Sequence, residues 1–449
     1  MTAGRRTPRS HGASAAVRHG TPDGGDVPGL DAGRGRHVLT MGLLSVSVLS
    51  FVANAVFSRL LGRSVYGAVG SVLALAALLA VPLSAVQSAV TRQVVVARAG
   101  VFRLGWPVAV TGVGAAALVT AAFLLVPLLD PLLHLSGDWV VVLLGAYLGA
   151  ILLEGVPRGA LVGERRYAWV GLAAAGGASA RLAIGWTWAA LRPGTVGPLV
   201  GAAAGEAVTA IVLLVLLAVG ARPGPRDGSL RIRDVGLSVV GFTGLLSLMS
   251  IDTVAARHWL SPQASGYYAA ASAGGSIAFF VSAAAATSIF PDVAKGVSSR
   301  DARAFRVGLA EVTGLALASA AALVAGAPLV VLVVFGHRYV AATAALRILA
   351  VSYGLLGILS YLVSHHLAHG SRAVLLPWSG AAVLVVAVVV AHRTTTTVAL
   401  DALVASGALV VVMGAASAYL ELRARAAAPG RSAIRAASTG VSRRGERSP

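Results

Sequence analysis

The sequence predicts an all-α integral membrane protein with twelve transmembrane helices arranged as two lobes of six. Hydrophobic residues make up 57% of the chain and charged residues only 12%, and the mean hydropathy is +0.82. This composition is typical of a chain that lies largely in lipid. Apolar runs of about 20 residues, the length that crosses a bilayer, follow one another along the sequence. An arginine-rich segment at 220–234 divides them into two groups of six.

Each apolar run is predicted to be a spanning helix. The runs lack the alternating polar positions of a membrane β-barrel and are about twice as long as a barrel strand. The expected spans lie near 38–58, 68–90, 106–129, 139–157, 167–191, 196–219, 235–256, 266–289, 307–335, 343–367, 373–392 and 398–420.

The same runs set the expected domain boundaries. The N-terminal lobe covers 38–219 and the C-terminal lobe covers 235–422, with the segment 220–234 as a linker. Basic tails at 1–37 and 423–449 lie outside the spans. Their Gly-, Pro- and Arg-rich composition predicts disorder and contact with anionic lipid.

The placement of the basic residues explains the net charge of +19. Of 36 Lys and Arg residues, 28 fall in the two tails and in the loops on their side of the membrane, and six fall in the opposite loops. This bias follows the positive-inside rule, so both termini are expected on the cytoplasmic side of the cell membrane. The charge therefore indicates topology, and we expect no nucleic-acid partner.

Few residues are available for catalysis. The longest opposite loop is only about Asp130–Asp138, and the single lysine, Lys295, lies in an Ala-Lys-Gly context that does not match a phosphate-binding loop. There is no His-Glu-x-x-His motif, no nucleophile elbow and no cysteine. We therefore expect no enzyme activity, no cofactor and no metal, which leaves transport, anchoring or scaffolding.

A weak internal repeat supports two related lobes. The segment Leu60–Ala68 follows the first predicted span, and Leu260–Tyr268 follows the seventh, about 200 residues later. Each carries Gly and Tyr at the turn into a long helix of small residues. Two six-helix halves in the same orientation imply parallel repeats with a central cavity between them.

Several short motifs resemble one family of exporters. The segment Phe51–Gly62, followed by Tyr66 and Gly67, resembles the opening of polysaccharide-biosynthesis flippases of the multidrug, oligosaccharidyl-lipid and polysaccharide (MOP) exporter superfamily. Similar matches occur at Phe290–Asp292, at Phe335–Tyr339 and at Leu346–Ala350.

This resemblance extends over about Val38–Leu422 and excludes the tails. It implies a MATE-like, two-lobed transporter with twelve helices that works by alternating access. It also implies a substrate in which a polyprenyl diphosphate carries an oligosaccharide or polysaccharide precursor.

A diphosphate that crosses lipid needs cationic partners, because each buried charge costs about 2.5–3.5 kcal/mol or more. Arg181 lies in the middle of the fifth predicted span, and Arg59, Arg92 and Arg257 lie at the ends of others. Arginine forms paired hydrogen bonds to phosphate, so these four residues are the candidate substrate contacts. For the three at helix ends, the alternative is that the side chain reaches the membrane interface.

Polar and acidic residues within the spans are candidates for ion coupling. Asp252 and Glu206 could bind and release a proton during the cycle, although Glu206 could instead pair with Arg181. Glu154 is expected near a helix end in an interfacial role. Asn54 is a further candidate substrate contact, and this uncharged residue in the first span argues modestly against a drug exporter.

Three histidines cluster near the end of the tenth predicted span. His365 and His369 are one helical turn apart, a spacing that can hold a metal, and His366 lies between them. The sequence identifies no third ligand, so the three are interpreted as ordinary interfacial histidines.

Two alternatives remain open beside the flippase. A cation-coupled multidrug exporter would need an acidic, aromatic-lined cavity, whereas aromatic residues make up only 6% of the chain. A non-transporting membrane scaffold for polysaccharide assembly would tolerate loss of the charges within its spans. The expected partners are the lipid-linked glycan, membrane lipids, and the glycosyltransferases and polymerase of a polysaccharide pathway.

Overall fold

The structure is a computed structural model that describes residues 32–97, 105–135, 139–219, 236–299, 302–391 and 394–426. Helices account for nearly all of these residues, and the described part of the chain contains no strand. The predicted linker and most of both tails lie outside the described residues.

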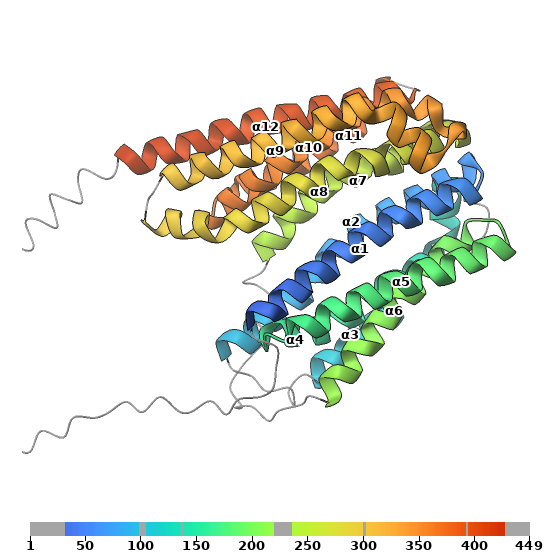
Figure 1. Cartoon of the computed structure of the whole chain (residues 1–449), viewed down its shortest axis with the longest axis horizontal. Coiled ribbons are helices and arrows are strands. Elements are labelled where there is room, and N and C mark those ends of the chain that lie inside the picture. Colours follow the sequence, from blue (N-terminus) through green and yellow to red (C-terminus); the bar gives the residue numbers. More distant parts are fainter. Residues whose placement is uncertain are drawn as a thin grey trace, which may run out of the picture.

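The N-terminal lobe is built from six helices (Figure 1). Its closest packing is between the fifth and sixth helices, the first and fifth, and the fourth with the second, third and sixth. The helices are α1 (Ala32–Leu60), α2 (Arg63–Ala97), α3 (Gly105–Leu133), α4 (Trp139–Gly163), α5 (Tyr167–Leu191) and α6 (Val196–Val219).

The C-terminal lobe also contains six long helices, with α10 at its centre in contact with α8, α9 and α12. A π-helical turn (Val331–Phe335) and a 3-10 turn (His337–Ala342) join α9 to α10 through Gly336, which has a positive φ of 90° that suits glycine. A second 3-10 turn (Arg372–Leu375) leads into α11. The helices are α7 (Gly236–Trp259), α8 (Pro262–Ser299), α9 (Ala302–Val330), α10 (Thr343–Ala368), α11 (Leu376–Ala391) and α12 (Thr395–Ala426).

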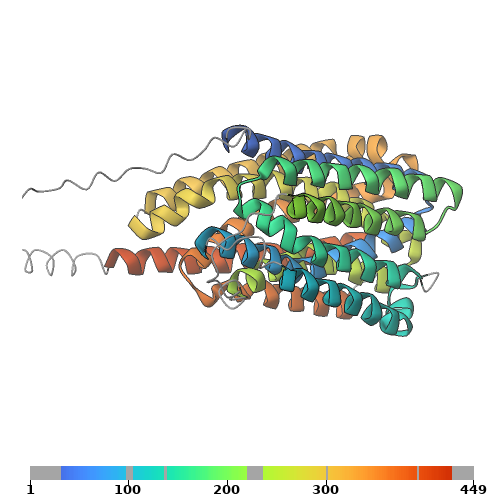
Figure 2. The same ribbon diagram turned by 90° about the horizontal axis from the view of Figure 1, so that it is seen from below.

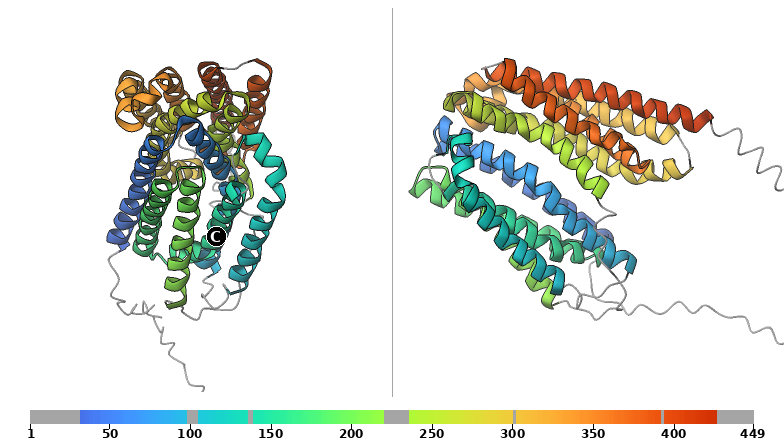
Figure 3. Two further views of the ribbon diagram at one scale, coloured as in Figure 1. Left: turned by 90° about the vertical axis from the view of Figure 1, so that its right-hand side faces the viewer. Right: turned by 180° about the vertical axis from the view of Figure 1, so that it is seen from behind.

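The two lobes converge at one end and diverge at the other (Figures 1 and 3). We call the end with the α1–α2 and α7–α8 turns the convergent end. We call the end at which α1 begins and α12 ends the divergent end (Figure 2). Helix α2 joins the lobes, because it packs on both α7 and α8.

Aromatic side chains fill the junction between the lobes at the convergent end. The ring of Tyr66 on α2 packs edge-on against Phe335 and Tyr339, and Tyr267 on α8 packs edge-on against Tyr339. Edge-to-face pairs of this kind add about 0.5–1.5 kcal/mol each beyond burial. The motif Phe335–Tyr339, found in the sequence, therefore closes this junction.

By length and composition, ten of the described helices can cross a membrane. Within the described residues, α5, which carries Arg181, and α8 are not among these ten. Both run alongside the other helices of their lobes (Figure 1). The prediction of an all-α membrane protein with a MATE-like fold is confirmed.

The helices at the two ends of the fold are longer than the predicted spans. Helix α1 begins at Ala32, not near 38, and α12 continues to Ala426, beyond 420. The sequence pattern marks the apolar stretch that lipid requires, whereas backbone hydrogen bonding continues into the flanking polar residues.

Candidate functional site

A cavity of about 360 Å³ lies inside the N-terminal lobe. Residues from α1, α2, α4, α5 and α6 line it, together with Leu246 of α7. The wall is mostly small and aliphatic, but four charged side chains reach it: Glu154, Arg158, Arg181 and Glu206. This cavity belongs mainly to one lobe, because five of its six contributing helices are in that lobe.

Glycine on α6 makes room for Arg181 on α5. A Cβ atom added to Gly205 would come within 2.6 Å of the Cβ of Arg181 and within 2.6 Å of the carbonyl oxygen of Gly177. Helices α5 and α6 can thus approach closely at this level, as small residues allow in membrane proteins. The close approach places Arg181 and Glu206, the residue after Gly205, on the same cavity.

Arg181 as a residue is half-buried, and its buried Nε has no hydrogen-bond partner in the described part of the chain. The charges of Arg181 and Arg158 both act on the carboxylate of Glu206. Arg181 and Glu206 share the cavity without forming a direct ion pair among the described residues. Arg181 therefore brings to the cavity wall a positive charge that no described carboxylate pairs with directly.

Glu154 has a different position from the one expected. It is 4% exposed, lines the cavity and forms an ion pair of 3.0 Å with Arg158, one turn later on α4. The sequence signal for this pair was the spacing i, i+4 of opposite charges on a helix. Arg158 belongs to the charged wall of the cavity, and sequence reasoning missed it as a candidate.

Two further polar residues of the cavity region were also missed. Gln87 of α2 lines the wall. The phenol of Tyr147 on α4 lies within the electrostatic reach of Arg181, Glu206 and Glu154. Neither residue has a distinctive sequence context, so only the packing of the lobe identifies it.

Asn54 lies outside this wall, near the convergent end of α1. Its side-chain oxygen accepts a hydrogen bond of 3.0 Å from the hydroxyl of Tyr66, and its amide nitrogen donates to the carbonyl of Ser50 at 3.0 Å. Ser50 itself lines the cavity. Asn54 thus connects the cavity to the junction between the lobes.

Arg257 connects the lobes at the convergent end. Its guanidinium donates to the carbonyls of Leu133 at 2.8 Å and His134 at 2.7 Å, to the carbonyl of Ser64 at 3.2 Å and to the hydroxyl of Ser265 at 3.1 Å. The carbonyls of Leu133 and His134 lie at the C-terminal end of α3, where carbonyl groups have no intrahelical N–H partner. Arg257 is 4% exposed, and these bonds engage it within the protein, away from the cavity.

Arg59 lies at the same end and is exposed. It donates to the carbonyls of Val333 and, at 3.2 Å, of Val334, at the end of the π-helical turn in the other lobe. The side chain of Arg92 lies outside the described residues. Of the four arginines predicted as substrate contacts, the structure therefore places Arg181 on the cavity and uses Arg59 and Arg257 at the junction.

Asp252 lies in the C-terminal lobe, in a buried polar network. Its carboxylate accepts hydrogen bonds from the hydroxyl of Tyr268 at 2.8 Å and from the backbone nitrogen of Thr253 at 2.6 Å. The hydroxyl of Thr253 reaches Ser272 at 3.1 Å, and Ser272 reaches Tyr353 at 2.6 Å. The two residues predicted for ion coupling, Asp252 and Glu206, thus lie in different lobes.

No protein-family model and no curated protein sequence matches the chain, but solved structures do. An inward-facing multidrug resistance MATE family transporter of the MOP superfamily matches with a TM-score of 0.68 and 14% identity, over 85% of this chain and 96% of that one. An inward closed structure of the lipid II flippase MurJ matches with a TM-score of 0.64 and 13% identity, over 84% and 86%. An outward-facing MATE family transporter gives 0.58 and 18%, over 88% and 96%.

These identities are low, so the likeness concerns the fold. The protein is a multi-pass membrane protein with the fold of MOP superfamily transporters.

Proposed function

We propose that this protein is a transporter that moves a polyprenyl-diphosphate-linked oligosaccharide or polysaccharide precursor across the cell membrane by alternating access. The observation that carries the proposal is the cavity of the N-terminal lobe, which Arg181 lines together with Arg158 and the carboxylates of Glu154 and Glu206. A volume of about 360 Å³ suits the head group of a substrate, with the lipid chain outside the cavity.

The energetics of the lobe support a ligand for Arg181. A charged side chain at the centre of a spanning helix costs about 2.5–3.5 kcal/mol or more, and such residues usually mark a substrate path. The adjacent glycine of α6 accommodates the stem of Arg181. A diphosphate can accept the paired hydrogen bonds that a guanidinium offers.

Alternating access requires one end of the lobes to close while the other opens. The convergent end is closed by Arg59, Arg257 and the aromatic junction. Helix α1 begins and helix α12 ends at the divergent end (Figure 2), and we propose that this end faces the cytoplasm. The described conformation is then inward-facing, which agrees with the higher TM-score against the inward-facing MATE structure than against the outward-facing one.

We also propose that an ion gradient drives the cycle through Asp252 or Glu206. Asp252 is 1% exposed and is held by hydrogen bonds from α8 and from its own helix. A carboxylate in such a position changes its local interactions when it gains a proton or a cation. The proposed assembly partners are the glycosyltransferases and polymerase that make and extend the glycan.

A multidrug exporter is the second candidate, and the cavity itself supports it. Glu154 and Glu206 offset the positive charges of the two arginines in the cavity wall. An organic cation could therefore bind in the same cavity, against these two carboxylates. Two of the matching structures are multidrug resistance transporters.

Proteoliposomes distinguish these functions. We expect purified protein to flip a fluorescent undecaprenyl-diphosphate-linked sugar, Arg181→Ala to abolish flipping, and Arg181→Lys to retain part of it. Arg192→Ala, an exposed residue after the end of α5, is the matched control and should flip normally. Uptake of an organic cation that depends on Glu206, with no lipid movement, would identify a drug exporter. Absence of both lipid movement and cation uptake in the wild-type protein would favour the scaffold, and normal flipping by Arg181→Ala would contradict the role of Arg181.

Membrane orientation has its own test, which the absence of native cysteine makes direct. We expect Gly62→Cys at the convergent end to react with a membrane-impermeant maleimide added to intact cells. Ser448→Cys in the C-terminal tail should react only after the cells are opened. The reverse pattern would overturn the assignment of the divergent end to the cytoplasm.

A further inference from the structure

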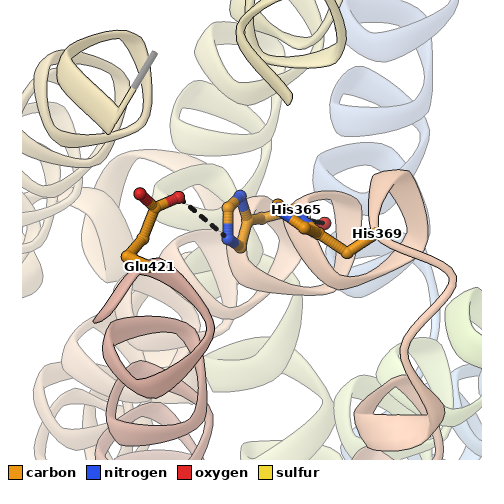
Figure 4. Close-up of side chains that lie close together, drawn as sticks. All are labelled: His365, His369 and Glu421. Carbon is orange, nitrogen blue, oxygen red and sulfur yellow. Dashed lines mark hydrogen bonds and ion pairs between the residues drawn. The ribbon is translucent and has the colours of Figure 1, made fainter. Parts of the chain in front are cut away.

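We propose that the C-terminal lobe contains a site for a divalent transition metal such as zinc, made by His365, His369 and Glu421. Figure 4 shows the carboxylate of Glu421 on α12 directed at the ring of His365 on α10, with His369 one helical turn further along α10. One ligand atom from each residue lies within 4.8 Å of the other two. This site is independent of the proposed transport function.

The buried ring of His365 gives the strongest indication that a metal ion binds here. It is fully buried, at 0% exposure, and neither of its ring nitrogens has a hydrogen-bond partner in the described part of the chain. Its Nε2 lies 3.9 Å from a carboxylate oxygen of Glu421, which exceeds hydrogen-bond distance. An unsatisfied buried nitrogen is costly, and a metal ion between the two residues would bind Nε2 of His365 and the carboxylate of Glu421.

His369 is prepared to act as a ligand by its own hydrogen bond. Its Nδ1 lies 2.9 Å from the backbone carbonyl of His365. Because a carbonyl can only accept, Nδ1 carries the proton and Nε2 presents its lone pair. Metal-binding histidines are commonly oriented in this way, through a hydrogen bond from the other ring nitrogen.

The surrounding packing fixes the ring of His365. The ring of Phe305 from α9 lies over it, with the ring centres 4.0 Å apart. The centres of the His365 and His369 rings are 4.3 Å apart. Tetrahedral zinc holds its ligand atoms about 3.3 Å from one another, so side-chain shifts of about 1 Å would complete the site.

Two nitrogens and one carboxylate oxygen suit zinc or a similar borderline ion and leave a fourth position for water. Glu421 is 18% exposed at the divergent end, so an ion can reach the site from water. The ion would link α10 to α12 at the end where the lobes diverge.

His366 provides a matched control. It neighbours His365 in sequence, but its Nε2 contacts the hydroxyl of Ser417 at 3.1 Å and the carbonyl of Met413 at 3.4 Å. Its Nε2 thus has protein partners, and His366 is not a member of the three-residue cluster.

The test uses full-length protein in detergent, purified without a histidine tag and stripped with a chelator. We expect one zinc ion per chain by calorimetry and elemental analysis, a zinc-dependent rise in melting temperature, and visible tetrahedral bands with Co²⁺. Glu421→Gln, an isosteric change at a partly exposed residue, and His369→Ala should each weaken binding by at least about tenfold. His366→Gln should bind as the wild type does.

Absence of stoichiometric binding by the monodisperse wild-type protein would overturn the proposal. Equal binding by wild type, Glu421→Gln and His369→Ala would also overturn it, because the ion would then occupy other histidines of the chain. Lipid flipping by the same preparations is measured separately, so the failure of one proposal does not imply the failure of the other.

Discussion

Gly67, the fifth residue of α2, lies directly against Gly266, the fifth residue of α8. A Cβ atom added to Gly67 would come within 2.7 Å of the backbone nitrogen of Gly266. The two glycines belong to the repeated segments that follow α1 and α7. The internal repeat is thus also a contact, because equivalent turns of the two lobes meet at the convergent end.

Gly67→Leu should open this contact. We expect overpacking to cost the convergent arrangement about 1–3 kcal/mol and to shift the population toward separation of the lobes at this end. Spin labels at Gly62→Cys and Gln263→Cys report the separation by double electron–electron resonance, without background from native cysteine. An unchanged distance distribution would contradict the role of the contact. Gly176→Leu is the control, since a Cβ there meets nothing within 4 Å.

Gly205→Ala should disturb the cavity through Arg181. The new methyl group would meet the Cβ of Arg181 at 2.6 Å, so we expect a loss of about 1–3 kcal/mol in stability together with reduced transport. Gly176→Ala in α5 is the matched change, and it should be neutral or stabilising by up to about 1 kcal/mol. Thermal melting in detergent and the flipping assay measure the two effects. Equal melting temperatures and flipping rates for the two variants would show that the close approach of α5 and α6 at Gly205 does not control stability or transport.

Tyr268→Phe and Tyr66→Phe remove equivalent hydrogen bonds from the two lobes. In each lobe a tyrosine of the second helix donates to a polar residue of the first, at 2.8 Å to Asp252 and at 3.0 Å to Asn54. A bond to a charged group contributes about 1.5–3 kcal/mol and a neutral one about 0.5–1.5 kcal/mol.

We therefore expect Tyr268→Phe to lower the melting temperature more than Tyr66→Phe if Asp252 is ionised. Equal losses would indicate that Asp252 is protonated in this conformation.

Asp252→Asn should abolish the dependence of transport on an ion gradient. Gradient-driven flipping by Asp252→Asn at the wild-type rate would remove Asp252 from the coupling proposal.

Arg257→Gln should weaken the junction far more than Arg59→Gln. Arg257 is buried and donates four hydrogen bonds: two to carbonyls at the C-terminal end of α3, one to α2 and one to α8. We expect its loss to cost at least about 3 kcal/mol, because the buried carbonyl of Leu133 and the partly buried bonds to Ser64 and His134 lose a charged donor. Arg59 is exposed and donates to two carbonyls, so its loss should cost about 1 kcal/mol or less. Similar melting temperatures for the two variants would contradict this assignment.

Local patterns in the sequence correctly predicted the twelve long helices of the described residues and their order. An apolar run of sufficient length forms a spanning helix wherever it lies, because unpaired backbone groups are so costly in lipid. The same rule identified Arg181, since a charge in the middle of such a run needs a partner. The sequence also indicated two related lobes, through the segments that contain Gly67 and Gly266.

Only the tertiary structure decided which helices bring their polar residues together. The sequence predicts Arg257 as a substrate contact, but in the structure its guanidinium donates to the carbonyl of Leu133 at the end of α3. The sequence predicts an interfacial position for Glu154, whereas the structure places it on the wall of the cavity. Glu421 lies 52 residues beyond His369 and has no motif of its own, yet α12 places it beside the histidines of α10. Helical periodicity gives the faces of each helix, but the rotation and neighbours of that helix are set by packing among all twelve, and this information is not local.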